Sequence, residues 1–298
     1  MEVKIGGGIL ANPVGVASGT FGYGSEYEKL IDLAKVGALY AKSVTLEPRA
    51  GNDIPRLIET PSGLLNSIGL ANVGINRYIE EKIPFFRTLP CPVIVNVAGE
   101  REEEYLTIVS RLSTEEVAWG FELNLSCPNV ARGLAFGTDA ASVRSLVKKV
   151  RATTEKPLIV KLTANVTDIC EIAMAAEEGG ADAVSCINTL VGMAIDIDKK
   201  RPVLSAGTGG LSGPAILPVG VAAVYRVSRS VSIPVVGIGG IFQPADAIQY
   251  LLAGASAIQI GTANFVDPST VERVADGIEH YADAQQFTSI DDFHSCLR

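Results

Sequence analysis

The chain has 298 residues, 47% of them hydrophobic, and a formal net charge of -8. This length allows one domain of barrel size or two smaller domains. The acidic balance disfavours nucleic acid and anionic membranes as main partners, because both need a basic face. No apolar run is long enough to span a membrane, and the N-terminal MEVKIGGG lacks a signal-peptide pattern, so we expect a cytoplasmic protein.

A regular alternation of predicted strands and helices runs along the chain. Short apolar, β-branched runs, typical of strands buried on both faces of a parallel sheet, cover residues 14–18, 38–43, 93–98, 121–126, 158–163, 182–188, 235–240 and 257–262. Helical spacing of apolar residues predicts helices over residues 25–36, 101–112, 140–154, 168–180, 215–228, 244–255 and 268–281. Ser25 is the expected N-cap of the first helix.

This alternation predicts the α/β fold class and a closed (β/α)8 TIM barrel formed by residues 1–298 as a single domain. A doubly wound open sheet is the alternative that the pattern leaves open. Long loops are expected after the second, fourth and sixth strands. Residues 44–73 and 189–213 are the longest of these connections, and loops of such length in a compact domain are usually functional.

Polar side chains stand where the first six predicted strands end. In a barrel of this type, these ends meet at the catalytic face. A lysine flanked by apolar residues can belong to a structural salt bridge, or its ammonium can face an anionic ligand. Amides supply both donors and acceptors, which suits a flat, heteroatom-rich molecule such as a pyrimidine or a flavin. The residues are Ser18, Lys42, Ser43, Asn96, Asn124, Lys161 and Asn188.

Glycines follow the last two predicted strands. Gly239 and Gly240 come after the seventh strand, and Gly261 and Thr262 come after the eighth. Barrels commonly form a phosphate site there from backbone N–H groups, and glycine allows a close approach. Either motif alone also fits an ordinary turn. Their occurrence at both positions favours a phosphate site.

The segment LNLSCPNV, residues 123–130, carries Cys127 in a predicted loop next to Pro128. A lone cysteine is more often an inert buried residue than a catalyst. This cysteine lies among polar side chains beside the predicted pocket, and the chain's only histidines, His280 and His294, lie near the C-terminus. We therefore interpret Cys127 as the candidate base. Competing carboxylates are present in the loop after the sixth strand, at positions 196 and 198.

The remaining cysteines give no sign of a metal site or a disulfide framework. No CxxC motif is present, and no cluster of histidine and cysteine occurs, so no metal is expected on this chain. The other cysteines are Cys91, Cys170, Cys186 and Cys296.

Motifs along nearly the whole chain resemble class 1 dihydroorotate dehydrogenases in order and spacing. They are NPVGVASG (12–19), KS (42–43), NSIGLAN (66–72), LNLSCPNV (123–130), VKLTANVTDI (160–169), INTLVG (187–192), GGLSGPAI (209–216), GIGG (237–240) and GTANF (261–265). The segments EPRAGNDIPR (47–56), SCPNVARGLAFGTD (126–139) and GTANF are most similar to class 1B, the NAD-linked catalytic subunit. Cys127 argues against class 2, which uses serine and has a membrane-associated N-terminal extension.

The resemblance implies an FMN enzyme that oxidises (S)-dihydroorotate to orotate in de novo pyrimidine biosynthesis. Cys127 falls on the base that removes the C5 proton, while hydride passes from C6 to flavin N5. The positions that fall on substrate contacts are Lys42, Asn66, Ser67, Ile68, Gly69, Leu70, Asn124, Asn129, Asn188 and Thr189. Those that fall on FMN contacts are Ser18, Lys42, Ser43, Asn96, Asn124, Lys161, Ile187, Gly213, Gly239, Gly240, Gly261 and Thr262.

Class 1B also implies a partner. Its catalytic subunit forms a homodimer within a heterotetramer, and a second subunit carries the FAD and the 2Fe–2S cluster that pass electrons to NAD+. The alternatives are a fumarate-linked class 1A enzyme, another FMN barrel acting on pyrimidines, a non-redox phosphate-binding barrel and a catalytically silent ligand-binding subunit. A tRNA dihydrouridine synthase is disfavoured by the acidic charge.

Overall fold

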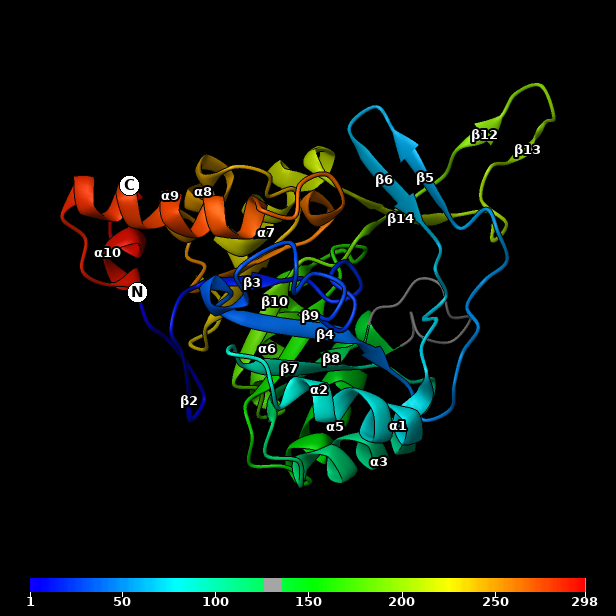
Figure 1. Cartoon of the computed structure of the whole chain (residues 1–298), viewed down its shortest axis with the longest axis horizontal. Coiled ribbons are helices and arrows are strands. Elements are labelled where there is room, and N and C mark those ends of the chain that lie inside the picture. Colours follow the sequence, from blue (N-terminus) through cyan, green and yellow to red (C-terminus); the bar gives the residue numbers. More distant parts are fainter. Residues whose placement is uncertain (126–135, 298) are drawn as a thin grey trace.

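A closed barrel of eight parallel strands forms the centre of the computed structural model, which describes residues 1–125 and 136–297. The strands follow the order β3-β4-β7-β8-β9-β10-β15-β16 around the barrel. Figure 1 shows several of them, with β4, β7 and β8 among those labelled. The predicted (β/α)8 architecture is confirmed, and the open sheet is excluded. The strands are β3 (Val14–Val16), β4 (Ala38–Val44), β7 (Val93–Val97), β8 (Ala118–Asn124), β9 (Leu158–Leu162), β10 (Ala183–Cys186), β15 (Val235–Ile238) and β16 (Ala257–Ile260).

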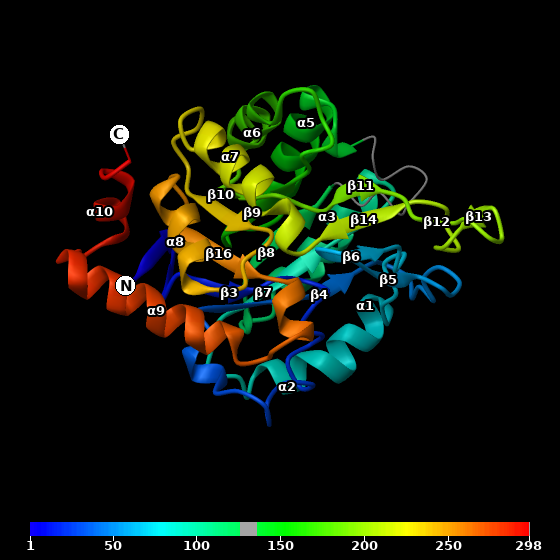
Figure 2. The ribbon, with the colours of Figure 1, turned by 90° about the horizontal axis from the view of Figure 1, so that it is seen from above.

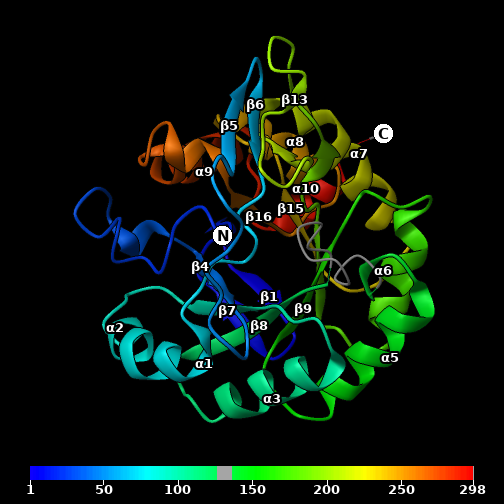
Figure 3. The same ribbon diagram turned by 90° about the vertical axis from the view of Figure 1, so that its right-hand side faces the viewer.

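Six of the predicted helices surround this barrel, and each buries one apolar stripe against the strands. In α5, for example, Val143, Leu146, Val147 and Val150 are buried, which is the spacing of one helix face. Figure 3 shows several of the outer helices around the strands. The confirmed helices are α3 (Glu102–Ser113), α5 (Ala140–Arg151), α6 (Ile169–Glu178), α7 (Leu217–Val227), α8 (Pro244–Leu252) and α9 (Thr270–Gln285).

The helix predicted over residues 25–36 is wrong. Only a short 3-10 turn, η1 (Leu33–Lys35), forms there. The chain instead folds back on itself: the Tyr27 ring stacks on Phe21 with centroids 3.8 Å apart, and the Tyr27 hydroxyl donates to the Thr20 carbonyl. These contacts within the loop are incompatible with a helix over residues 25–36, although the apolar residues have helical spacing.

The helical segment after β4 was not predicted. It consists of α1 (Gly74–Arg77), the π-helical segment η2 (Tyr78–Lys82) and α2 (Ile83–Phe86), which follow one another without a break. Its Pro84 stands at the first turn of α2, where proline is tolerated. The proline and the change to π-helical spacing interrupt the periodicity on which the sequence prediction depended.

The two longest predicted loops form a sheet together rather than remaining irregular. Residues from both loops pair in the antiparallel order β11-β14-β6-β5, and Gly210 of one loop pairs with Asn66 of the other. Figure 2 shows these strands beyond the carboxyl ends of the barrel strands. They are β5 (Leu57–Thr60), β6 (Gly63–Asn66), β11 (Leu190–Gly192) and β14 (Gly209–Ser212), and a separate hairpin joins β12 (Ile195–Asp196) to β13 (Arg201–Pro202).

Short elements complete the fold. A hairpin of β1 (Val3–Ile5) and β2 (Gly8–Leu10) precedes the barrel, and α10 (Ile290–His294) follows it. Two 3-10 turns, η3 (Pro214–Ile216) and η4 (Thr262–Phe265), lie after β14 and β16. Among the helices of the described residues, none is long and apolar enough to cross a membrane.

Gly220 gives a test of the packing between α7 and α8. A Cβ at this position would lie 1.8 Å from the Tyr250 hydroxyl oxygen. Helix propensity alone predicts that Gly220→Ala stabilises the chain by about 1 kcal/mol. We expect the opposite, a loss of roughly 1–3 kcal/mol from overpacking, measured by urea denaturation. The control is Gly7→Ala, where an added Cβ meets nothing within 4 Å; a stabilised Gly220→Ala protein would contradict this packing.

Candidate active site

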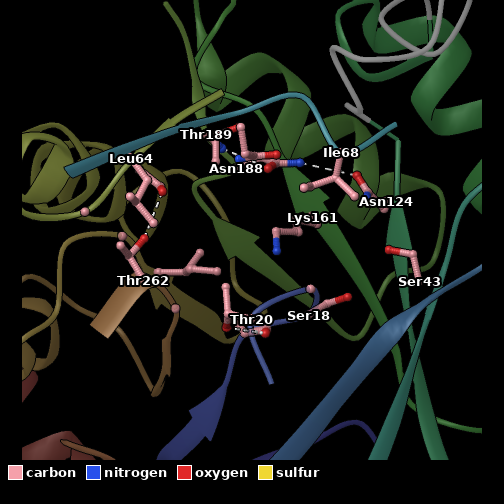
Figure 4. A pocket seen from close by; sticks show the side chains of 18 of the residues that line it. Ser18, Thr20, Ser43, Leu64, Ile68, Asn124, Lys161, Asn188, Thr189 and Thr262 are labelled. Carbon is pink, nitrogen blue, oxygen red and sulfur yellow. Dashed lines mark hydrogen bonds between the residues drawn. The ribbon is translucent and has the colours of Figure 1, made fainter. Parts of the chain in front are cut away.

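A cavity opens at the carboxyl ends of the barrel strands and is covered in part by the sheet of β5, β6, β11 and β14. All but four of the predicted site residues line it, although they come from segments far apart in the sequence. Figure 4 shows several of their side chains around one space. The predicted residues that line the cavity are Ser18, Lys42, Ser43, Asn66, Ile68, Gly69, Leu70, Asn124, Lys161, Ile187, Asn188, Thr189, Gly213, Gly239, Gly240, Gly261 and Thr262.

The other four predicted residues lie elsewhere or outside the described chain. Asn96 and Ser67 are fully buried but do not line the cavity. Asn96 lies behind Ser43, whose hydroxyl donates to Asn96 Oδ1 at 2.5 Å. Cys127 and Asn129 lie outside the described residues. Asn124, the last residue of β8, lines the cavity.

The cavity also has lining residues that sequence reasoning missed. Leu57 and Leu64 belong to β5 and β6, and they form an apolar wall that depends on the pairing of two distant loops. Ser212 lies in the GGLSG motif, which was noted without assigning this residue, and its hydroxyl oxygen accepts from Thr262 at 2.8 Å. The others are Ala17, Gly19, Thr20, Ala71, Ile216, Ile238 and Phe265. Of these, Gly19 and Thr20 could have been found from their place after the first predicted strand.

One end of the cavity is formed by backbone rather than by side chains. Gly213, Gly239 and Gly240 have φ angles of 97°, 127° and 73°, which L side chains rarely adopt. A Cβ on Gly240 would also lie 2.7 Å from the backbone nitrogen of Leu217. The backbone N–H groups of Gly213 and Gly240 donate to no oxygen within the described chain. This end therefore suits an anionic group such as a phosphate.

Lys161 stands on the floor of the cavity. It is 6% exposed, and Figure 4 shows its side-chain nitrogen directed into the open space. Its nearest counter-charge is the Glu122 carboxylate, with 3.9 Å between Lys161 Nζ and Glu122 Oε2. This distance is too long for a hydrogen bond, so the donors of the ammonium remain available for a ligand.

Lys42 is a second cation in the wall, and it differs from Lys161 in having no close counter-charge. Its side-chain nitrogen forms no hydrogen bond and no ion pair with any described residue, although the side chain is largely buried. Burial lowers the pKa of the Lys42 ammonium, and the positive charge of Arg56 lowers this pKa further, while the negative charge of Glu26 opposes the shift only in part. An unpaired, buried ammonium in a cavity is a binding group for an anion.

The side-chain amide at the end of the sixth barrel strand, Asn188, is hydrogen-bonded to the one at the end of the fourth, Asn124. Asn188 Nδ2 donates to Asn124 Oδ1 at 3.3 Å, and the backbone N–H of Thr189 donates to Asn188 Oδ1 at 2.8 Å. Asn165 Nδ2 donates to the Thr189 carbonyl at 3.0 Å and supports this turn from behind. The two cavity amides therefore have fixed orientations, and they can offer donors and acceptors to a planar ligand.

The comparison with known proteins identifies the family. A family model described as "Dihydroorotate dehydrogenase" matches residues 1–281. The chain belongs to the dihydroorotate dehydrogenase family.

Relatives within this family share about half of the residues of the chain. A protein of Trichlorobacter lovleyi is 52% identical over 282 residues, which cover 94% of this chain and 93% of the relative. A protein of Geotalea uraniireducens is 49% identical over 298 residues, which cover 100% and 98%, and one of Geobacter sulfurreducens is 52% identical over 282 residues, which cover 94% and 92%. Each of these relatives is named "Dihydroorotate dehydrogenase B (NAD(+)), catalytic subunit".

The part of the chain that the structure describes contains no group of three or more histidine, cysteine, aspartate or glutamate side chains that could hold a metal ion. The cavity of this member of the dihydroorotate dehydrogenase family instead combines backbone donors, two ammonium groups and fixed amides. This set suits an organic anion with a planar ring.

The buried charge of Lys42, which the Glu26 carboxylate offsets only in part, predicts a gain in stability on its removal. The folded-state pKa of Lys42 lies below that of the unfolded chain, so its charge opposes folding at neutral pH. This destabilising contribution of the Lys42 charge decreases as the pH rises from the folded-state pKa to the unfolded-state pKa of Lys42. We expect ligand-free Lys42→Met to have a higher urea midpoint than the unaltered protein at neutral pH and a smaller rise in stability at alkaline pH.

The control for this experiment is Lys29→Met, which removes an exposed lysine outside the cavity and should leave the urea midpoint nearly unchanged. A lower midpoint for Lys42→Met than for Lys29→Met would show that Lys42 has a stabilising partner.

Proposed function

We propose that the chain is the FMN-dependent catalytic subunit of an NAD+-linked dihydroorotate dehydrogenase, with residues 1–298 acting as a single domain. It oxidises (S)-dihydroorotate to orotate in de novo pyrimidine biosynthesis. The observation that carries the proposal is the convergence of two lysines, fixed amides and a glycine-lined anion site in one cavity of a chain that belongs to this family. The names of the relatives support the NAD+-linked class.

The residues of the cavity fit FMN. The positive-φ glycines, with the unused N–H groups of Gly213 and Gly240, suit the phosphate, and Gly261 and Thr262 complete that end. Lys161 and Ser43 lie on the floor, where an ammonium and a hydroxyl can face the edge of a flat ring. Ser18, Asn124 and Ile187 line the same space. When bound there, FMN supplies the acceptor for the hydride of the substrate.

Dihydroorotate suits the remaining part of the cavity. Its carboxylate needs a cation, and Lys42 is an ammonium without a close counter-charge. Its ring presents amide N–H and C=O groups, which the side chains of Asn66, Asn124 and Asn188 can match. Ile68, Gly69, Leu70 and Thr189 also line this region, while Ser67 is buried next to Asn66 and Ile68 and does not line it.

Cys127 is proposed as the base that removes the C5 proton while hydride leaves C6. Asn129, two residues further on, is proposed as a substrate contact. Both lie within five residues of Asn124 in the sequence, and Asn124 lines the cavity, which supports these two proposals. A thiolate next to a C–H acid can act as a general base, and it requires no histidine.

A partner subunit completes the proposed assembly. The relatives are named as catalytic subunits, which supports a second subunit for electron transfer. We propose that this partner carries FAD and a 2Fe–2S cluster, that it passes electrons to NAD+, and that two catalytic subunits form the core of a heterotetramer. A cytoplasmic location is proposed with it.

The first test of this function is reduction of the bound flavin. We expect the purified chain to be yellow with FMN and the flavin absorbance to be bleached by dihydroorotate without oxygen. We expect turnover with NAD+ only after co-expression with the partner subunit. Absence of bleaching at saturating dihydroorotate would contradict the substrate, and efficient use of fumarate by the isolated chain would indicate class 1A instead.

A second test concerns Cys127. Cys127→Ala should retain FMN but slow its reduction by dihydroorotate by about 10²–10⁴-fold, because the general base is lost. Stopped-flow absorbance without oxygen gives this rate directly. The control is Cys296→Ala, which alters an exposed cysteine outside the cavity and should reduce normally. Equal rates in the two variants would remove Cys127 from the mechanism.

A further inference from the structure

A buried carboxylate lies beneath the floor of the cavity. Glu122 belongs to β8, has no exposed surface and does not line the cavity. Its neighbours come from strands around the barrel: Asn96 Nδ2 donates to Oε2 at 2.6 Å, and Ser185 Oγ and Gln259 Nε2 each donate to Oε1 at 2.8 Å. Every one of these groups is a donor, which is the environment of an ionised carboxylate.

A buried charge of this kind is costly, and hydrophobic residues of similar volume often serve stability at least as well. Its place in the barrel suggests another role, because two of its contacts continue to the cavity. Through Asn96, whose Oδ1 accepts from the Ser43 hydroxyl at 2.5 Å, Glu122 fixes one side chain of the floor. Through its charge, 3.9 Å from Lys161 Nζ, it fixes the other.

The carboxylate also acts over distance inside the barrel. The phenol of Tyr40 is buried below the cavity, and its pKa is raised first by burial and then by the negative charge of Glu122. The same charge reaches Lys161, which unlike Tyr40 faces the cavity. The field that a ligand meets above the floor is therefore the sum of the Lys161 ammonium and the Glu122 carboxylate.

We propose that Glu122 is a positioning residue that holds Lys161 and, through Asn96, Ser43 against the cofactor, and that its charge sets the reduction potential of the bound flavin. This inference rests on the proposed function, because it requires FMN above the floor. Glu122 touches neither the cofactor nor the substrate, and its effect passes through Lys161 and Ser43.

The substitution Glu122→Gln separates this role from simple packing. A glutamine amide has only one acceptor oxygen. We expect this oxygen at the position of Oε1, where Ser185 and Gln259 both donate. The NH2 group would then stand at the place of Oε2 and face the donors Asn96 Nδ2 and Lys161 Nζ. Asn96 would have to turn its amide, and the Ser43 hydroxyl would lose its acceptor. The substitution is therefore expected to alter the positions of Lys161 and Ser43, which line the cavity.

Two measurements are made on each variant: the dissociation constant of FMN from titration of the FMN-free chain, and the reduction potential of the bound flavin. For Glu122→Gln we expect FMN binding to weaken by at least tenfold. We also expect the equilibrium between oxidised and reduced flavin to shift at least tenfold towards the reduced form, about 30 mV for a two-electron couple, because a negative charge beneath it is gone.

Glu122→Asp keeps the charge but shortens the side chain by one methylene. We expect its flavin potential to stay within a few millivolts of that of the unaltered protein, while FMN binding still weakens because the contacts to Asn96 and Lys161 are lengthened. This variant decides the positioning role even if Glu122→Gln does not fold. Unchanged FMN binding in Glu122→Asp would overturn the positioning role.

The matched control is Asp182→Asn, which also replaces a carboxylate by an amide but lies outside the cavity lining, where Asp182 pairs with Arg151. It should alter neither quantity. An equal shift of potential in Asp182→Asn and Glu122→Gln would overturn the charge role of Glu122. If the unaltered chain binds no FMN, the proposed function itself fails, which is a different outcome from normal FMN binding with insensitive Glu122 variants.

Discussion

Closure of the barrel is the constraint on which the site depends. The last strand, β16, pairs with the first, β3, through Ile258 and Val14, and this pairing brings the two ends of the chain's strand sequence together. Only in a closed ring do Ser18 after the first strand and Thr262 after the eighth line one cavity. Seven of the eight strands, all except β7, contribute lining residues at or just after their carboxyl ends, and none of them forms a site alone. The chemistry of the cavity is thus a consequence of tertiary closure.

The barrel interior is not uniformly apolar, because several polar side chains gather inside the ring of strands. The strands bury Val, Ile and Leu against the helices, while Asn96, Glu122, Ser185 and Gln259 gather inside. These polar groups are almost fully paired with one another, as buried polar groups must be. Their hydrogen bonds fix the floor before any ligand binds. A rigid floor of this kind lowers the cost of orienting a cofactor.

The sequence was informative where structure is local and repetitive. All eight barrel strands were predicted because a parallel strand is buried on both faces and appears as a continuous apolar run. The cavity residues at strand ends followed from the barrel and from the family resemblance together. The error at residues 25–36 has a physical reason: the ring of Tyr27 stacks on Phe21, and such a contact is not visible in helical spacing. The pairing of Asn66 with Gly210 joins residues far apart in the sequence, so the wall containing Leu57 and Leu64 was not predicted.

The position of Asn96 shows a finer limit. A strand-end amide was expected to face the ligand, yet Asn96 lies one layer lower and supports Ser43. The alternation of residues along a strand predicts which side chains point into the barrel. How far below the cavity such a side chain lies depends on the stagger of the strands around the barrel. Sequence patterns therefore predict which residues stand at the strand ends, but not which of them reach the cavity and which lie beneath it. The distinction between a contact residue and its support therefore requires the structure.

The two lysines of the cavity differ in how their charges are balanced by the rest of the protein. Lys161 has its counter-charge, Glu122, inside the fold, so its charge is balanced before any ligand arrives. Lys42 has no close counter-charge among the described residues, and the positive charge of Arg56 lowers its pKa further. In the proposed function, the carboxylate of the substrate supplies a close counter-charge for Lys42. On this proposal, binding of the anion offsets part of the free-energy cost of burying the Lys42 ammonium in the ligand-free cavity.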